Sequence, residues 1–465
     1  MELFERAKLL LTKYYGYDDF RPSQRPVVRD ILLGRDVLAV LPTGGGKSIC
    51  FQIPALALKR LTVVVSPLIA LMTDQVEGCR KRGIAARALT SATTLTERAA
   101  VDRELRDHSL RLLYVSPERL RALAPYLRDT IGPPGLLAID EAHCISEWGH
   151  DFRPAFRQLR DARTALGDPP VIALTGSATA GVRRDIADSL GLGAHGRRVA
   201  MHVASFDRAN LWLGGEEVRD ERDRLHRLLR LVPRDGSISI VYAPTRGMVD
   251  GLALALRRAG RKALAYHAGL DGDARRLGLQ RFLAGELEVV VATCAFGMGI
   301  DKADVRRVVH WAMPPTPESY YQEAGRAGRD GGFARCTLLW HQADPALQRR
   351  QLDVTFPPRT ELERLWRDPA RLARASASIR ETAERLRQEL RPEDGAVDWA
   401  KLARRRQAAE SRMIAMARYA LGRRCRRKAL LEWFGEAMGA CAGCDVCEKS
   451  PKRSALKRVV ARLGW

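Results

Sequence analysis

The stretch DVLAVLPTGGGKS, residues 36–48, places an apolar run directly before three glycines, a lysine and a serine. A helical pattern follows, so this stretch predicts a strand, a glycine-rich turn and a helix in succession. Similar short apolar runs, separated by helical patterns, are expected to form strands at residues 62–66, 112–116, 136–140 and 171–175, and then at 237–242, 262–267, 288–293 and 307–311. Strands that alternate with helices predict α/β folding with parallel sheets and crossover connections.

The two series of strands predict two α/β domains, over residues 1–205 and 206–343. The charged, strand-poor segment 344–420 is interpreted as a helical connector or insert. Residues 421–449 are rich in cysteine and basic side chains, and residues 450–465 form a short basic tail. Ligands of parallel sheets bind at the carboxyl ends of the strands, and both sets of candidate motifs lie there.

The charge of the chain favours a polyanionic partner. The 465 residues include 78 Lys and Arg against 55 Asp and Glu, which gives a formal net charge of +23. Nucleic acid is the first candidate, and a merely solvated basic surface is the alternative. The start, MELFERAKLL, lacks a signal-peptide pattern, and no apolar run is long enough for a transmembrane helix. We therefore expect a cytoplasmic location and no membrane contact.

The glycine-rich turn LPTGGGKS, residues 41–48, departs from the strict phosphate-loop pattern because Leu41 stands where its first glycine belongs. The remaining pattern still lets backbone N–H groups approach phosphate oxygens. Lys47 would supply a charge to the β- and γ-phosphates, and the hydroxyl of Ser48 would bind Mg²⁺. The alternative is a glycine-rich turn with a surface lysine.

The run LLAIDEAH, residues 136–143, ends an apolar strand with two adjacent acids. Asp140 would hold Mg²⁺ through water, and Glu141 would orient and deprotonate an attacking water. A helix N-terminus that carries acids is the alternative. Arg326 and Arg329, which lie three residues apart beside the glycines of EAGRAGR, would reach the γ-phosphate from the second domain and stabilise transition-state charge.

Four of the nine cysteines cluster late in the chain, at Cys425, Cys441, Cys444 and Cys447. One distant cysteine and two overlapping C-x2-C pairs suit tetrahedral Zn²⁺. A structural zinc site of this kind would fold a small segment, with redox-active thiols as the alternative. The basic residues in RRCRRK, 423–428, suit duplex phosphates or simply form a charged face.

Taken together, these residues resemble a known family. The chain resembles a superfamily 2 helicase motor in four stretches, TGGGKS (43–48), DEAH (140–143), SAT (177–179) and QEAGRAGR (322–329). It resembles the RecQ helicases specifically in three further stretches, YGYDDFRPSQ (15–24), CISEWGHDFRPAF (144–156) and CRRKALLEWFGE (425–436). The resemblance covers roughly residues 10–342 and 421–448. It implies two RecA-like domains, followed by a mainly helical segment and a zinc-binding module.

The resemblance also implies ATP as the nucleotide. Tyr17 would stack on adenine, Gln24 would read its edge, and Arg21 would support the pocket. Simple core packing is the alternative for Tyr17. The implied residues that bind ATP or Mg²⁺ in the first domain are Tyr17, Arg21, Gln24, Thr43, Gly44, Gly45, Gly46, Lys47, Ser48 and Asp140.

Residues 144–156 correspond to an aromatic-rich loop by resemblance, and they follow Glu141 directly. Bases of single-stranded DNA stack on aromatic rings at about 1–3 kcal/mol each. Ordering of this loop by DNA would therefore align Glu141, with a local hydrophobic staple as the alternative. The residues expected to bind DNA or to couple the two events are His143, Trp148, His150, Phe152 and Arg153.

The resemblance thus implies an ATP- and Mg²⁺-dependent 3′–5′ DNA helicase with bound Zn²⁺, which acts in DNA repair or recombination in a bacterial nucleoid. The expected partners are single-stranded and tailed duplex DNA, with single-strand-binding protein as a candidate, and the expected state is a monomer. Family members continue with a winged helix and a further helical (HRDC) domain, which the residues after Lys449 cannot accommodate. Whether the chain separates duplex strands is therefore an open question. The alternative functions are a DNA-binding scaffold or annealing factor, or an RNA helicase.

Overall fold

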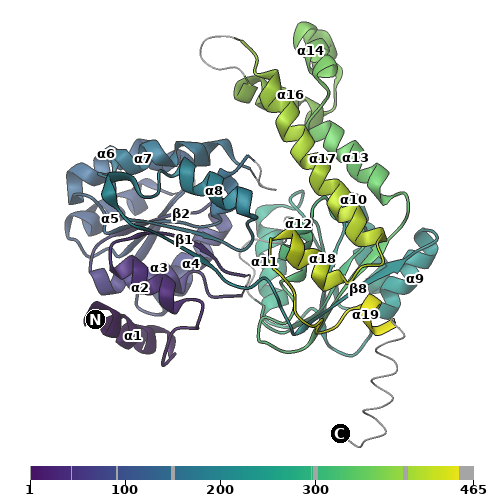
Figure 1. Cartoon of the computed structure of the whole chain (residues 1–465), viewed down its shortest axis with the longest axis horizontal. Helices are drawn as coiled ribbons and strands as arrows, with labels where there is room; N and C mark the ends of the chain where they lie inside the picture. Colours follow the sequence, from purple (N-terminus) through teal and green to yellow (C-terminus); the bar gives the residue numbers. More distant parts are fainter. Residues whose placement is uncertain are drawn as a thin grey trace, which may run out of the picture. The chain divides into compact units, whose positions relative to one another are not determined.

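The computed structural model divides the chain into two compact units, which join between Phe206 and Asp207. The described residues are 2–42, 44–90, 93–147, 152–294, 296, 302–390 and 396–449. The N-terminal unit is drawn in purple to blue and the C-terminal unit in teal to yellow (Figure 1).

The N-terminal unit is built on a parallel sheet with the strand order β3-β4-β2-β5-β6-β1-β7. Its described strands are β1 (Asp36–Val40), β2 (Thr62–Val65), β3 (Ala86–Leu89), β4 (Leu112–Val115), β5 (Leu136–Ile139), β6 (Val171–Thr175) and β7 (Val199–Val203). Five of these strands are buried along their whole length, as strands covered on both faces must be. The predicted parallel α/β fold is therefore confirmed in this unit.

Helices cover both faces of this sheet (Figure 1). They are α1 (Glu2–Tyr15), α2 (Arg25–Leu32), α3 (Ile49–Leu58), α4 (Ile69–Lys81), α5 (Leu95–Arg106), α6 (Pro117–Ile131), α7 (Leu159–Ala165) and α8 (Ala180–Ser189). Short 3-10 turns are η1 (Ala142–Ile145), η2 (Pro154–Gln158) and η3 (Ala194–Gly196). Side chains from α1, α2 and α3 share one buried cluster with the strands.

Two strands of this unit, β3 and β7, are not predicted by the pattern of apolar runs in the sequence. β3 has the sequence ARAL, which is short and interrupted by arginine. β7 lies at the sheet edge, and its side chains alternate between exposed and half-buried. Each gains its place by pairing with a neighbour, β4 or β1, rather than from an apolar run of its own.

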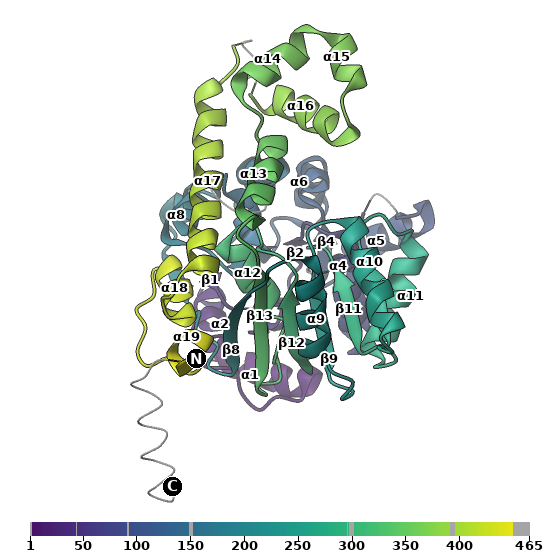
Figure 2. The same cartoon turned by 90° about the vertical axis from the view of Figure 1, so that its right-hand side faces the viewer.

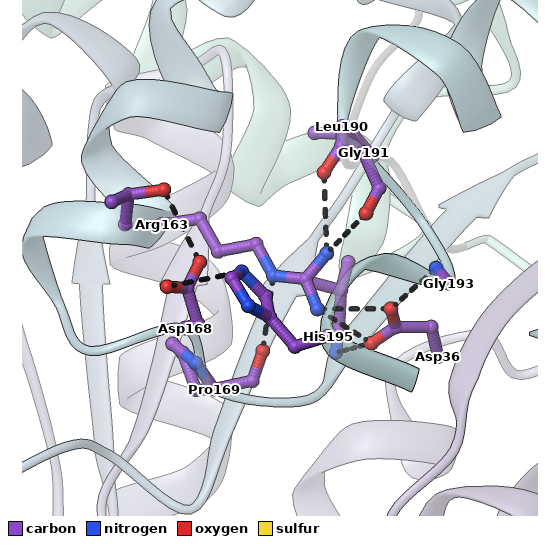
Figure 3. Close-up of polar contacts among 10 residues, drawn as sticks. Asp36, Arg163, Asp168, Pro169, Leu190, Gly191, Gly193 and His195 are labelled. Carbon is purple, nitrogen blue, oxygen red and sulfur yellow. Dashed lines mark hydrogen bonds and ion pairs between the residues drawn. The ribbon is translucent and has the colours of Figure 1, made fainter. Parts of the chain in front are cut away.

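The start of β1 is fastened by a buried ionic network (Figure 3). Asp36 is 0% exposed and accepts two hydrogen bonds from Arg163 Nη2, at 2.8 and 2.9 Å. The backbone N–H groups of Val171 and Gly193 donate to the same carboxylate at 3.0 and 2.9 Å. Arg163 also donates to the carbonyl of Gly191 at 3.0 Å. These bonds join β1, α7, β6 and the loop before β7 at the amino edge of the sheet.

The C-terminal unit contains a second parallel sheet, with the strand order β10-β11-β9-β12-β13-β8. Its described strands are β8 (Leu211–Glu217), β9 (Ile238–Tyr242), β10 (Ala263–Tyr266), β11 (Val289–Ala292), β12 (Val305–His310) and β13 (Ala334–Trp340). Its helices before β13 are α9 (Glu221–Leu231), α10 (Arg246–Arg258), α11 (Gly272–Leu283) and α12 (Pro317–Ala324). The second predicted α/β fold is confirmed, with β8 and β13 added to the expected strands.

A helical region follows β13 and belongs to the same compact unit (Figure 2). Its helices are α13 (Asp344–Thr355), α14 (Arg359–Arg367), α15 (Pro369–Arg374), α16 (Ala377–Leu390), α17 (Trp399–Leu421), α18 (Arg426–Trp433) and α19 (Asp445–Lys449). Leu362, Leu386 and Leu402 belong to a small core of their own. The expected helical segment and cysteine module are both present, and the module lies against β8 through a bridge between Leu213 and Cys444.

Candidate active site

The glycine-rich turn lies between β1 and α3, at the carboxyl edge of the first sheet. Gly44 and Gly46 have φ values of +81° and +71°, which favour glycine. A Cβ on Gly46 would lie 2.4 Å from Gln24 Nε2. Lys47 and Ser48 are half-buried just before α3, and Cys50 N and Phe51 N of its first turn donate to their carbonyls at 3.0 and 3.2 Å. This geometry can receive a phosphate, and Thr43 lies outside the described residues.

Two residues predicted to contact adenine hold the turn in place here. The buried amide of Gln24 donates to the carbonyls of Gly45 and Gly46, at 2.9 and 3.1 Å, and accepts from Arg21 N at 3.0 Å. Arg21 Nη1 donates to the carbonyl of Gly44 at 2.6 Å. The ring of Tyr17 is 52% exposed and thus open to stacking. Adenine recognition by these residues stays a prediction, since Gln24 would have to exchange its present bonds.

The acidic pair follows β5 at the same edge of the sheet. Asp140 is 9% exposed, and burial, together with Glu141, raises its pKa to about 7. The charge of Lys47 and a 3.0 Å bond from Glu141 N to Asp140 Oδ1 act in the opposite direction. Lys47 therefore lies near enough to Asp140 for its charge to act on the carboxyl group. A carboxyl that is buried beside a second acid fits a divalent cation, whose charge would replace the proton.

Glu141 continues into a buried polar chain. Its backbone is in the left-handed region, at φ +49°, and its Oε2 lies 3.3 Å from His143 Nδ1. His143 Nδ1 also lies 3.0 Å from Thr175 Oγ1, at the end of β6. Thr175 Oγ1 in turn donates to the carbonyl of Ser177 at 3.2 Å. The predicted His143 link is thus connected to the SAT segment through Thr175, a residue that the sequence reasoning missed because threonine at a strand end carries no distinctive signal.

The aromatic segment is described only in part. Trp148 and His150 lie outside the described residues. Arg153 Nη1 donates to the carbonyl of Pro67 at 2.8 Å, and Arg153 N donates to the carbonyl of Cys144 at 2.9 Å. Arg153 thereby ties the segment after Glu141 to the loop after β2. Phe152 is half-buried beside it, and a DNA role for these residues stays a prediction.

In the C-terminal unit, Arg326 and Arg329 follow directly after α12. Arg326 is buried. Burial raises the pKa of Tyr242, while the charges of Arg326 and Arg329 act to lower it, so both guanidinium groups lie near the end of β9. Tyr242 itself donates to the carbonyl of Phe296 at 2.8 Å. The guanidinium charges of the two predicted arginines thus act on Tyr242, while the backbone between them bonds to the start of β12, where Gly328 N donates to the carbonyl of Val305 at 2.9 Å.

The cysteine cluster has the geometry of a zinc site. The Sγ atoms of Cys425, Cys441, Cys444 and Cys447 all lie within 4.8 Å of one another. The Cys425 and Cys444 Sγ atoms are 3.9 Å apart. Four thiolates about 2.3 Å from a central ion would stand at roughly this separation in a tetrahedron. Burial raises the pKa of Cys441, so a bound cation is needed to hold that sulfur as thiolate.

Family models match three parts of the chain. They are the DEAD/DEAH box helicase at residues 21–186, the helicase conserved C-terminal domain at 221–331 and RecQ zinc-binding at 381–448. The last match covers the four cysteines and confirms the expected zinc-binding module. Among the described helices, none has the length and apolar character needed to cross a bilayer.

A solved structure shares the fold. It is that of Mycobacterium smegmatis helicase Lhr bound to ssDNA and AMP-PNP, which is 21% identical with a TM-score of 0.56. The alignment covers 76% of this chain and 49% of that one.

Curated relatives are closer in sequence. An ATP-dependent DNA helicase RecQ of Haemophilus influenzae is 37% identical over 96% of this chain and 64% of its own length, so this chain spans less than two thirds of that relative. A probable ATP-dependent DNA helicase RecS of Bacillus subtilis is 40% identical over 74% of this chain and 68% of its own length. With the zinc-binding match, these similarities lead to one conclusion: the chain belongs to the RecQ family of ATP-dependent DNA helicases.

Proposed function

We propose that this chain is an ATP-driven motor that moves 3′ to 5′ along single-stranded DNA and unwinds tailed duplexes during DNA repair or recombination. Family membership and the net charge of +23 support DNA as the track. The observation that carries the proposal is the cluster of Lys47, Asp140 and Glu141 at one sheet edge, in which an acid pair lies near the glycine-rich turn. The polarity comes from the family resemblance.

The N-terminal unit would bind the triphosphate. Backbone N–H groups of the glycine-rich turn would hold phosphate oxygens, and Lys47 would pair with the β- and γ-phosphates. Ser48 and Asp140 would hold Mg²⁺, which when bound neutralises developing phosphate charge. Glu141 would orient the attacking water and accept its proton. His143 holds the Glu141 carboxylate at 3.3 Å and so restricts where that water can lie.

The C-terminal unit would supply Arg326 and Arg329 to the γ-phosphate when nucleotide draws the two units together. Such arginines are worth about 10³–10⁵ in rate in related phosphoryl transfers. Hydrolysis would cleave the γ-phosphate, and departure of the inorganic phosphate would remove the charge that these arginines bind and release the C-terminal unit. Alternating grip of the two units on one DNA strand would then produce movement.

DNA would be coupled to hydrolysis through the segment that follows Glu141. Arg153 already links this segment to the loop after β2, and Glu141 is continuous with it in sequence. A strand that stacks on the aromatic side chains of residues 144–156 would thus bias the position of Glu141. Hydrolysis would be slow without DNA and fast with it.

ATP hydrolysis with and without single-stranded DNA tests the proposal. The wild-type protein should show hydrolysis that single-stranded DNA stimulates more than RNA of the same length does. Lys47→Ala should abolish this hydrolysis, because it removes the positive charge that would pair with the phosphates. DNA-stimulated hydrolysis that persists in Lys47→Ala would exclude this site, and equal stimulation by RNA would favour an RNA motor.

Strand separation is tested on duplexes that carry either a 3′ or a 5′ single-stranded tail. Unwinding of the 3′-tailed duplex alone supports the proposed polarity. Stimulated hydrolysis without unwinding of either duplex would indicate a translocase or an annealing factor instead.

A further inference from the structure

Arg208 lies near the start of the C-terminal unit and bonds to the loop that carries Arg326 and Arg329. Its Nη1 donates to the carbonyl of Gly325 at 3.3 Å, and its Nη2 donates to the carbonyls of Ala327 and Gly328 at 3.1 and 2.8 Å. We call residues 325–329 the arginine loop. One guanidinium thus binds carbonyl oxygens on both sides of Arg326.

The same loop is held by Asn210. Its Nδ2 donates to the carbonyls of Gly328 and Gly332, at 2.9 Å in each case, while its Oδ1 accepts from Arg208 Nε at 3.3 Å. Gly328 has a φ of +55°, and a Cβ there would lie 2.5 Å from both Asn210 Nδ2 and the carbonyl oxygen of Gly332. The loop backbone is therefore built to present its carbonyl groups to Arg208 and Asn210.

Arg208 is in turn held by the zinc-binding module. Arg427 on α18 is buried, and its Nη1 donates to the carbonyl of Arg208 at 2.9 Å and pairs with the carboxylate of Asp207. Its Nη2 donates to the carbonyl of Leu211. α18 begins at the residue after Cys425, so a zinc ligand lies two residues before this guanidinium.

The other end of the cysteine cluster is tied to the same strand. Arg426 Nε donates to Asp445 Oδ1 at 3.2 Å, and Asp445 Oδ2 accepts from Gly215 N in β8 at 3.1 Å. Asp445 follows the ligand Cys444. Both ends of the cluster are therefore anchored on the segment 207–215, from which Arg208 reaches the arginine loop.

Arginine is the side chain that this arrangement requires. Its planar group offers five N–H donors in a fixed fork, whereas a lysine ammonium is a compact point charge that cannot span carbonyls on both sides of Arg326. Burial lowers the pKa of Arg208, which shows that the site places this cation at a cost in hydration. The hydrogen bonds from Arg208 to the loop carbonyls offset this cost, and they fix the path of the backbone on both sides of Arg326.

We propose that Arg208 is a positioning residue for Arg326 and Arg329, and that the zinc-binding module supports it through Arg427. This inference rests on the proposed ATP hydrolysis. Displacement of the loop by about 1 Å can cost 10²-fold in rate when geometry governs catalysis. Loss of Arg208 would therefore lower kcat while leaving KM for ATP nearly unchanged, because Lys47 and the glycine-rich turn belong to the other unit.

The same unit provides a matched control. Arg261 is half-buried like Arg208 and also donates to three backbone carbonyls, those of Val232, Ala259 and Leu229, at 3.0, 2.7 and 2.8 Å. These carbonyls lie before β9 and β10 rather than in the arginine loop. Arg261→Met should therefore lower thermal stability as Arg208→Met does but leave kcat within about twofold of wild type.

The experiment compares Arg208→Met, Arg427→Met and Arg261→Met in the full chain, with Arg208→Lys in case the methionine variant fails to fold. Steady-state hydrolysis with single-stranded DNA should show kcat lowered about 10²-fold by Arg208→Met or Arg208→Lys, and about 10-fold by Arg427→Met, with KM within about threefold. Zinc content, measured by atomic absorption, should stay at one per chain in each variant.

Amide hydrogen exchange provides a readout that needs no activity. Residues 325–332 should exchange faster in Arg208→Met and Arg427→Met, but not in Arg261→Met. Unchanged exchange there, or a kcat for Arg208→Met and Arg208→Lys equal to that of Arg261→Met, would overturn the positioning role. A wild-type protein without hydrolysis would instead refute the proposed function, while the exchange result would still decide whether Arg208 and Arg427 hold the loop.

Discussion

Two buried aspartates lie at opposite edges of the first sheet and have opposite surroundings. Asp36, at the amino edge, accepts bonds from Arg163, Val171 N and Gly193 N (Figure 3). Asp140, at the carboxyl edge, lies beside Glu141, and its pKa is raised to about 7. One carboxylate is fully paired by the chain itself, whereas the ionised form of the other is disfavoured and would be stabilised by an added cation. The difference separates a residue that holds the fold from one that is available for chemistry.

The largest expected effect is on hydrolysis. Asp140→Asn should lower DNA-stimulated ATP turnover by about 10³-fold, because the site loses an anionic oxygen for Mg²⁺. A matched Asp36→Asn variant should keep kcat within about threefold wherever it remains folded, since Asp36 lies at the far edge of the sheet. Steady-state kinetics at a temperature well below both melting points checks this, and a similar kcat loss in the two variants would remove the contrast.

The next effect is on folding. Asp36→Ala should lower the free energy of unfolding by about 3–5 kcal/mol, because Arg163 is left as a buried cation without its carboxylate. The double variant Asp36→Ala/Arg163→Met should recover part of this loss, since it removes both charges. Urea denaturation followed by circular dichroism measures both values. A double variant less stable than Asp36→Ala would mean that Arg163 acts mainly through the carbonyls of Leu190 and Gly191.

A smaller effect of opposite sign is expected for the stability of Asp140→Asn. The folded-state pKa of Asp140 is raised, so its favourable contribution is complete below the unfolded pKa and is lost as pH rises through about 7. In the absence of Mg²⁺ at pH 8, Asp140→Asn should therefore be more stable than wild type by about 1 kcal/mol. The advantage should shrink towards pH 5, and thermal unfolding in Mg²⁺-free buffer without chelator across this range tests it. An advantage that grows on acidification would contradict the assigned direction.

The smallest effect concerns the rim of the Asp36 network. His195 Nε2 lies 3.4 Å from Asp168 Oδ2, but the His195 side chain is 61% exposed. His195→Asn should change stability by less than about 0.5 kcal/mol, because exposed ion pairs contribute little. Asparagine is chosen since it tolerates the left-handed backbone at this position, φ +58°. A loss above 2 kcal/mol in urea denaturation would show that the network extends to the surface.

The parts of the fold that could be predicted are those with a local sequence pattern, such as an apolar run or a cysteine spacing. Fully buried strands such as β2 and β5 were predictable because both of their faces need apolar side chains. β3 and β7 were not, since ARAL is short and β7 is an edge strand with an alternating, partly exposed pattern. The cysteine cluster was predictable because the spacing of its four thiols is typical of a zinc site.

The candidate site shows the same division. The neighbourhood of Lys47 and Asp140 follows from two strand ends of one parallel sheet. The present contacts of Gln24 with Gly45 and Gly46 do not follow from any motif, because they depend on how the chain before α2 folds over the turn. Thr175 and Arg208 carry no motif of their own.

By itself, the sequence determined the fully buried strands, the glycine-rich turn, the acidic pair and the four clustered cysteines, because each is encoded by residues close together or by a distinctive spacing. Only the tertiary structure decided that Asp36 would meet Arg163 and that Arg208 would meet the arginine loop, since these partners lie 127 residues apart and 117 to 120 residues apart, respectively. Buried polar groups must find partners wherever the packed chain provides them, and that choice is made by the whole fold rather than by neighbouring residues.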